Sequence, residues 1–232
     1  MYQILAKFYD ALVKDDDATL EWVHFLEEHA SFHSVIEYAC GSGEITCMLA
    51  NLGYEIHASD LSNEMIEEAK RKKGAEKVDF KVRNMCEFAD EKADLVICLC
   101  DSMNYLTEDE EFLQVIDNAY HNLNEQGTFI FDVHSLDRLK EFEEEFYEEG
   151  MIEGCGYQWS IETQKEEIHQ NFVFFDEQAH PTYEQHIQRV YDPKILLKWC
   201  EEKGFDVEIY TDFKKKGICE GEKYFYVCRR KS

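Results

Sequence analysis

The sequence predicts an α/β fold: a doubly wound seven-stranded sheet, its last strand antiparallel, with a small antiparallel β insertion after the fifth strand. Two observations lead to this fold class. From Ser34 onward, short apolar runs alternate with amphipathic stretches, as in parallel strands covered by helices on both faces. From about Phe146 to Val190, polar and apolar residues alternate with no stretch long enough for a helical crossover, which favours antiparallel strands.

The order of the elements follows from the spacing of apolar residues. Residues 2–30 carry apolar residues at helical spacing and predict two helices. The first includes Tyr2, and the second follows the acidic residues 15–17, which favour a helix start. Strands and helices are then expected in alternation. The expected strands are residues 34–39, 54–58, 78–82, 94–100 and 128–133, and the expected helices are residues 43–52, 62–73 and 108–123.

The later part of the chain predicts the insertion. We expect residues 1–145 and 191–232 to form the core, and residues 146–190 to form an antiparallel insertion that serves as a substrate lid. The acidic run at 141–150 predicts a solvated helix face or a loop.

A helix and two strands are expected to close the fold. Asp192 and Pro193 predict the N-cap and the first residue of this helix, and Gly204 predicts its end. The two final strands follow, joined as a hairpin across KKKGICEG.

Composition excludes several classes of partner. The chain has 232 residues and a formal charge of −26, which disfavours nucleic acids and anionic membranes and suits a small basic or neutral ligand. Its nine cysteines form no C-x-x-C pair, so we expect reduced thiols and no metal site. No targeting or spanning segment is evident, which predicts a cytoplasmic protein. The sequence leaves a homodimer open.

The stretch VIEYACGSGEIT, residues 35–46, predicts a strand, a tight glycine turn and a helix. A phosphate-binding P-loop would need a Lys after the glycines, and none is there. A dinucleotide site would need a third glycine where Thr46 stands. Both kinds of phosphate site are therefore disfavoured.

Two carboxylates flank this turn. Asp60 ends the second strand, where it can accept hydrogen bonds from both hydroxyls of a ribose, although it could also cap the next helix, a role that suits Ser62 better. Glu37 precedes the turn and suits a cationic or amine-bearing ligand. The pattern indicates a nucleoside that carries an amine.

The turn and four further segments together resemble class I S-adenosylmethionine-dependent methyltransferases. The matching segments are EYACGSG at 37–43, ASDLS at 58–62 with Met65, Asn84-Met85, ADLVICLCDSMNYL at 93–106 and GTFIFDV at 127–133. Within that family the chain is most similar to small bacterial enzymes with an antiparallel insert, including sugar-amine N-methyltransferases. The features shared with these are FYD at 8–10, DSMNYL, DVHS at 132–135, Arg189 and Tyr191.

The resemblance implies a Rossmann-like methyltransferase sheet and S-adenosylmethionine as cofactor. The cofactor-binding residues that it implies are Tyr9, Glu37, Tyr38, Ala39, Gly41, Ser42, Gly43, Asp60, Leu61, Met65, Asn84, Met85, Cys100 and Asp101. His134, at the end of the fifth strand, is the candidate base for the proton of the acceptor, with a structural histidine as the alternative. The substrate candidates are Tyr105, Trp159, His186, Arg189 and Tyr191, which could instead pack a sheet face.

The predicted activity is transfer of the methyl group of S-adenosylmethionine to a small-molecule acceptor by direct displacement, which needs little beyond positioning. The alternative is a catalytically silent nucleoside-binding regulatory or scaffold protein on the same fold. An open cavity under the insert would favour the enzyme, and a filled one the binding protein. A nicotinamide-dependent oxidoreductase is disfavoured by the missing third glycine.

Overall fold

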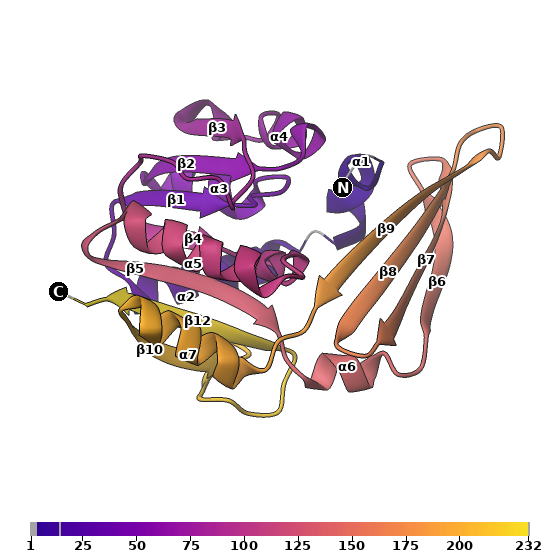
Figure 1. Ribbon diagram of the computed structural model, residues 1–232. Coiled ribbons are helices and arrows are strands. Elements are labelled where there is room, and N and C mark those ends of the chain that lie inside the picture. Colours follow the sequence, from indigo (N-terminus) through magenta and orange to yellow (C-terminus); the bar gives the residue numbers. More distant parts are fainter. Residues whose placement is uncertain (1–3, 14, 232) are drawn as a thin grey trace.

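A computed structural model describes residues 4–13 and 15–231 of the chain, so Tyr2 lies outside the described residues (Figure 1). An α/β body carries the larger sheet, and a second, smaller sheet stands beside it (Figure 1). Within the part of the chain that is described, no helix is both long and apolar enough to cross a membrane.

The larger sheet confirms the doubly wound prediction but has eight strands, in the order β11-β10-β12-β5-β4-β1-β2-β3. Its strands are β1 (Ser34–Tyr38), β2 (Glu55–Asp60), β3 (Val78–Val82), β4 (Ala93–Cys98), β5 (Leu123–His134), β10 (Phe205–Thr211), β11 (Lys215–Lys216) and β12 (Lys223–Arg230). The first five are parallel, whereas β12 runs antiparallel between β5 and β10, as expected for the last strand. The eighth strand is the two-residue β11, which forms within the predicted hairpin loop and pairs with β10.

Helices cover both faces of this sheet, because successive strand residues point to opposite sides. Val35 packs with α2 and α3 on one face, and its neighbour Ile36 packs with α5 and α7 on the other. The helices are α1 (Leu5–Val13), α2 (Asp16–His29), α3 (Glu44–Leu52), α4 (Asn63–Ala69), α5 (Asp109–Asn122), α6 (Asp137–Glu141) and α7 (Pro193–Lys203), with short 3-10 turns η1 (Ala75–Lys77) and η2 (Ser102–Tyr105). The sheet therefore has an apolar core on each side.

Local capping residues set where several helices begin and end. Ser62 caps α4 by accepting a hydrogen bond from the backbone N–H of Met65 at 3.2 Å. Asp192 caps α7 in the same way through Lys194, and Gly204 ends it with a φ of 112°. The helix expected over 62–73 is shorter than predicted and ends at Ala69.

The second sheet is antiparallel, in the order β6-β7-β8-β9. Its strands are β6 (Phe146–Ile152), β7 (Cys155–Gln164), β8 (Glu167–Phe175) and β9 (Pro181–Arg189). The prediction of a helix face or loop over 141–150 is wrong from Phe146 onward, because this segment pairs with β7 as an edge strand. Its glutamates stay solvated at the edge, and they hide the alternating pattern of a strand.

Helix α1 lies between the two sheets. Phe8 of α1 stacks on Phe174 of β8, with ring centroids 5.2 Å apart. On the same helix, Asp10 accepts a hydrogen bond from the Ser42 hydroxyl in the glycine turn, at 2.5 Å. Helix α1 therefore connects the insert to the edge of the larger sheet where the carboxyl ends of its parallel strands meet.

Candidate active site

A cavity of about 590 Å³ opens at the carboxyl ends of β1, β2 and β4. The order of the strands reverses between β1 and β4, which is where open α/β sheets bind ligands. The cavity collects most of the predicted cofactor residues. Those that line it are Tyr9, Glu37, Ala39, Gly41, Ser42, Gly43, Asp60, Leu61, Met65, Asn84, Met85 and Cys100.

The two glycines of the turn serve different purposes. Both have positive φ, 54° at Gly41 and 78° at Gly43, a conformation that favours glycine. A Cβ on Gly43 would lie 2.8 Å from the Cβ of Ala69, so Gly43 allows the turn to pack against α4. A Cβ on Gly41 would meet no atom within 4 Å. Gly41 therefore leaves open space for a ligand beside the backbone.

Asp60 ties the end of β2 to the turn. Its Oδ2 accepts a hydrogen bond from the Gly41 N–H at 2.8 Å, and its Oδ1 accepts one from the Ser62 N–H at 2.8 Å. Burial raises the pKa of this carboxyl, and these backbone donors act against the rise. Because each carboxylate oxygen has a second lone pair, Asp60 can still accept hydrogen bonds from a ligand in the cavity.

Glu37 is a buried carboxyl at the base of the cavity. The Thr46 hydroxyl donates a hydrogen bond to its Oε2 at 2.6 Å. Burial raises the pKa of Glu37 to about 8, and this hydrogen bond only partly opposes the rise. A cationic ligand group nearby would favour the ionised form, so the site suits an amine.

The sequence did not point to Lys72, which helps to hold α1 over the cavity. Its ammonium pairs with Asp10 of α1 and with Glu44 at the start of α3. Asp10 in turn accepts from Ser42, so the three segments form one network at the mouth of the cavity. A lysine just after a short helix carries no distinctive sequence signal.

A second cavity of about 280 Å³ lies between the core and the second sheet. Leu5, Phe142, Ile161, Ile168 and Phe172 provide its apolar wall. Its polar lining comprises Asp101, His134, Arg138, Trp159, Gln170, Gln188 and Lys223. The two cavities are neighbours, because Tyr9, Cys100, Tyr105 and His186 line both. The space under the insert is thus open.

One side of the second cavity carries a cluster of charged groups. The Lys223 ammonium lies 2.6 Å from Asp101 Oδ1 and 3.3 Å from Asp132 Oδ2, and His134 Nδ1 lies 3.6 Å from Asp101 Oδ1. Burial acts to raise the pKa of Asp101, but the adjacent Lys223 ammonium holds it well below its ordinary value. Burial raises the pKa of Asp132 and lowers that of His134. The imidazole is therefore neutral beside an ionised carboxylate.

The structure brings together Tyr105, Trp159, His186 and the candidate base His134 around the second cavity. Asp101, predicted beside the cofactor, lines this cavity and not the larger one. The cluster includes Lys223, which the sequence did not indicate, because β12 places it opposite His134 of β5 from far along the chain.

Three predicted site residues line neither cavity. The Tyr38 hydroxyl donates to Asn122 Oδ1 at 2.5 Å, because its side chain points into the core toward α5. Arg189 donates to the Thr107 carbonyl at 2.9 Å and pairs with Asp109 at the start of α5. Tyr191 is buried against Phe112 and donates to the Leu106 carbonyl. Arg189 and Tyr191 therefore fasten the end of the insert to the core.

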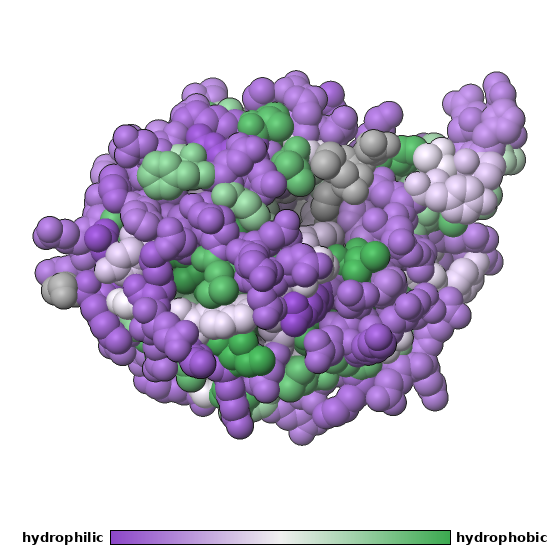
Figure 2. All heavy atoms as spheres, viewed as in Figure 1, coloured by the Kyte–Doolittle hydropathy of each residue, from purple (hydrophilic) through white to green (hydrophobic). Residues whose placement is uncertain are grey.

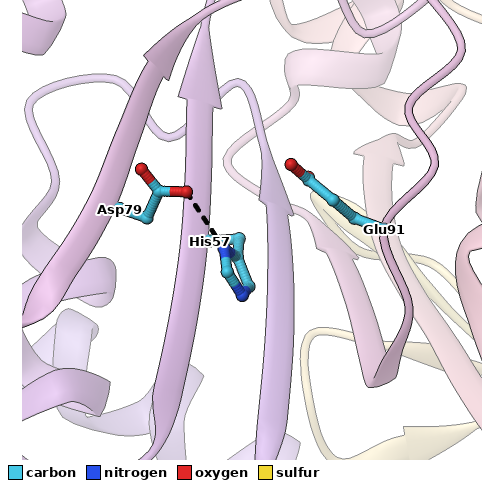
Figure 3. A group of neighbouring side chains, drawn as sticks. All are labelled: His57, Asp79 and Glu91. Atoms are coloured by element: carbon cyan, nitrogen blue, oxygen red, sulfur yellow. Dashed lines mark hydrogen bonds and ion pairs between the residues drawn. The ribbon is translucent and has the colours of Figure 1, made fainter.

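A group of ligating side chains lies outside both cavities. His57, Asp79 and Glu91 come from separate segments and converge on one region (Figure 3). Lys81 already pairs with Asp79 at 3.0 Å and with Glu91 at 2.5 Å, and Arg83 pairs with Glu91 at 3.2 Å. Protein cations thus neutralise the carboxylates that a metal ion would need.

The fold and the site define a Rossmann-like α/β protein with a ligand cavity at the switch point of its sheet. Residues 35–127 match the family model described as a methyltransferase domain. A protein of Geobacillus sp. (strain WCH70), provisionally named methyltransferase GWCH70_2453, is 28% identical and is aligned over 99% of both chains. YqeM of Bacillus subtilis (strain 168), also provisionally named a methyltransferase, is 27% identical over 91% of this chain and 89% of its own.

Solved structures with the same fold cover nearly the whole chain. An S-adenosylmethionine-dependent methyltransferase from Clostridium acetobutylicum has a TM-score of 0.82 and is 22% identical. The superposition covers 99% of this chain and 97% of that one. The sugar N-methyltransferase KedS8 from Streptoalloteichus sp. has a TM-score of 0.80 and is 19% identical. The superposition covers 100% of this chain and 94% of KedS8. The domain match, the curated relatives and these structures together support the resemblance to class I S-adenosylmethionine-dependent methyltransferases that is seen in the sequence.

Proposed function

We propose that the protein methylates a small-molecule acceptor that occupies the second cavity. The observation that carries this proposal is the boundary that the two cavities share at Tyr9, Cys100, Tyr105 and His186. An acceptor held under the insert would lie beside a cofactor held at the glycine turn, with this boundary between them. Direct methyl transfer requires such an approach, because its main requirement is the alignment of the reacting atoms.

The residues around the larger cavity fit S-adenosylmethionine. When bound, this cofactor would supply a methyl group attached to a positively charged sulfur. The sulfur is the leaving group when an acceptor atom takes the methyl group. Asp60 would accept from the ribose hydroxyls, Glu37 would face the cationic end, and Gly41 would leave space beside the backbone. Asn84 and Met85 line the part of the cavity formed by the segment after β3 and would hold the adenine.

The lining of the second cavity favours a neutral or amine-bearing acceptor. The Trp159 Nε1–H is buried and has no hydrogen-bond partner among the described residues, so it offers a donor to a ligand oxygen. A carboxylate acceptor would face the ionised Asp101, since Lys223 is already paired with Asp101 and Asp132. KedS8, which shares the fold, is named a sugar N-methyltransferase, and this supports a nitrogen acceptor.

His134 is the residue that we assign as general base for an acceptor that enters with its nucleophilic atom protonated. Its imidazole lines the second cavity and is neutral at physiological pH, because burial lowers its pKa. The proton would pass to this ring, and the lone pair would remain on the acceptor atom. An acceptor that enters already neutral would need positioning alone.

The test is a screen of amines, sugars and small acids with S-adenosylmethionine, following both methylated product and S-adenosylhomocysteine. Ile161→Trp should block the second cavity and abolish methyl transfer, with calorimetric binding of S-adenosylmethionine retained. Glu162→Trp is the matched control, because the next residue of β7 points to the opposite face of the sheet. Saturable cofactor binding with no product from any acceptor would favour the silent binding protein.

A further inference from the structure

The side chain of Gln188, on β9 of the insert, has a fixed orientation. Its Nε2–H donates to the backbone carbonyl of Asp101 at 3.3 Å. A carbonyl oxygen can only accept, so the amide nitrogen must lie on that side. The amide oxygen then faces the other way, where it accepts from Gln170 Nε2 at 2.9 Å. Gln188 is itself buried, being only 2% exposed.

This orientation decides where His134 carries its proton. His134 Nε2 lies 3.2 Å from the Gln188 amide oxygen, so Nε2 must be the donor. The neutral ring then has a bare Nδ1. That nitrogen is buried and has no hydrogen-bond partner among the described residues. It lies 3.6 Å from Asp101 Oδ1, another acceptor, so a ligand N–H or O–H placed there would satisfy both atoms.

We propose that Gln188 is a positioning residue that holds His134 in its Nε2–H tautomer and thereby makes Nδ1 the atom that takes the proton of the acceptor. This inference rests on the proposed function, because it concerns the same pocket. In the step, the N–H or O–H bond of the acceptor breaks, its electron pair stays on the acceptor, and the proton bonds to Nδ1. The ring becomes an imidazolium that faces Asp101 through Nδ1 and Gln188 through Nε2.

The surrounding charges favour this assignment. The charged groups that face the imidazole are Asp101, Lys223 and Arg138. Burial lowers the pKa of His134, so the ring is neutral and able to accept a proton, while Asp101 acts to raise that pKa. Lys223 keeps Asp101 ionised, and the carboxylate can stabilise the imidazolium once it has formed.

The tautomer can be measured without an acceptor or cofactor. Long-range ¹H–¹⁵N correlation spectra of histidine-labelled protein distinguish the two neutral forms, and His134→Asn assigns the resonance. We expect the Nε2–H form in the wild-type chain. Gln188→Met removes the acceptor at Nε2, so we expect the proton to move to Nδ1 and donate to Asp101. Gln188→Glu keeps an acceptor and should restore the Nε2–H form.

Three results would overturn the inference: an Nδ1–H form in the wild-type chain, an unchanged tautomer in Gln188→Met, or an Nδ1–H form in Gln188→Glu. Gln164→Met, on the exposed end of β7, is the matched control and should leave the tautomer unchanged. Unchanged resonances of the other histidines show that a variant is folded. If an acceptor is found, Gln188→Met should lower kcat about 10²-fold with cofactor affinity unchanged, and Gln188→Glu should recover activity. If none is found, the tautomer still tests Gln188 separately from the proposed function.

Discussion

Lys223 at the start of β12 and Asp101 just after β4 form an ion pair, with the ammonium 2.6 Å from Asp101 Oδ1. The two residues are far apart in the sequence and meet because β12 is inserted antiparallel beside β5. Lys223 also lies 3.3 Å from the fully buried Asp132, so one cation serves two carboxylates. The antiparallel last strand thus supplies the charge that holds one side of the second cavity.

Lys223→Met should destabilise the protein by about 3 kcal/mol, because it leaves the buried, ionised Asp101 without its cation and removes a partner of Asp132. Urea unfolding at neutral pH measures the loss. The variant should recover stability on acidification, as Asp101 and Asp132 become protonated. The exposed Lys198, which pairs with Glu202 at 3.6 Å, is the control, and Lys198→Met should change stability by less than about 0.5 kcal/mol. Equal effects of the two substitutions would refute the structural importance of Lys223.

Glu37 should make stability depend on pH in a direction opposite to that of most carboxylates. Its pKa is about 8 in the folded chain, above the ordinary 4.5, because of burial. Folding therefore favours the protonated carboxyl, a contribution that is fully present below the ordinary pKa and is lost as the pH rises through about 8. Glu37→Gln keeps an acceptor for Thr46 and cannot ionise. From about pH 6 to about pH 9, the unfolding free energy of the wild-type chain should fall by about 1–3 kcal/mol more than that of Glu37→Gln.

Urea unfolding at those two pH values measures this difference. Glu177→Gln, at an exposed turn between β8 and β9, should behave as the wild-type chain does. A second readout is calorimetry of S-adenosylmethionine binding near neutral pH in buffers of different ionisation enthalpy. A cationic ligand should ionise Glu37 and release a proton in the wild-type chain but not in Glu37→Gln. Identical proton release in both chains would argue against the assignment of Glu37.

The two glycines of the turn should respond differently to alanine. Gly43→Ala adds both backbone strain and a contact 2.8 Å from Ala69, so we expect a loss of about 2–4 kcal/mol in unfolding free energy. Gly41→Ala adds strain alone, about 1 kcal/mol, but places a methyl group in the cavity wall. Its main effect should be a weaker affinity for S-adenosylmethionine, measured by calorimetry. A stability loss at Gly41 as large as that at Gly43 would contradict this distinction.

Most of the lining of the larger cavity could be predicted from the sequence because its residues are local. Gly41 and Gly43 lie in one turn, and Asp60 and Asn84 each follow a recognisable apolar strand. In a parallel sheet the carboxyl ends of such strands share one edge, so the cavity follows from topology. Local apolar patterns also predict the strands. The exceptions are β6, where glutamates mask the alternation, and the two-residue β11.

The lining of the second cavity could not be predicted to the same degree, because it depends on pairing across elements. The roles of Lys223 and Gln188 follow from the position of β12 beside β5 and of β9 against the end of β4. Conversely, Arg189 and Tyr191 have side chains that suit a substrate pocket, but they face the start of α5 and the core. Residue type indicates chemistry, whereas tertiary contacts decide which residues reach the ligand.

Asp60 should contribute to both structure and cofactor affinity, and two substitutions can separate these contributions. Asp60→Ala removes the acceptor for the N–H groups of Gly41 and Ser62, which should cost about 1–3 kcal/mol of stability and more than about tenfold in affinity for S-adenosylmethionine. Asp60→Asn keeps one acceptor oxygen for the turn but cannot accept from two ribose hydroxyls in a bidentate way. It should therefore lose one of the two hydrogen bonds to the turn, keep part of the stability and still bind the cofactor more weakly, as calorimetry and urea unfolding can measure. If Asp60→Asn bound S-adenosylmethionine as tightly as the wild-type chain, Asp60 would serve the turn alone, and the ribose assignment would be wrong.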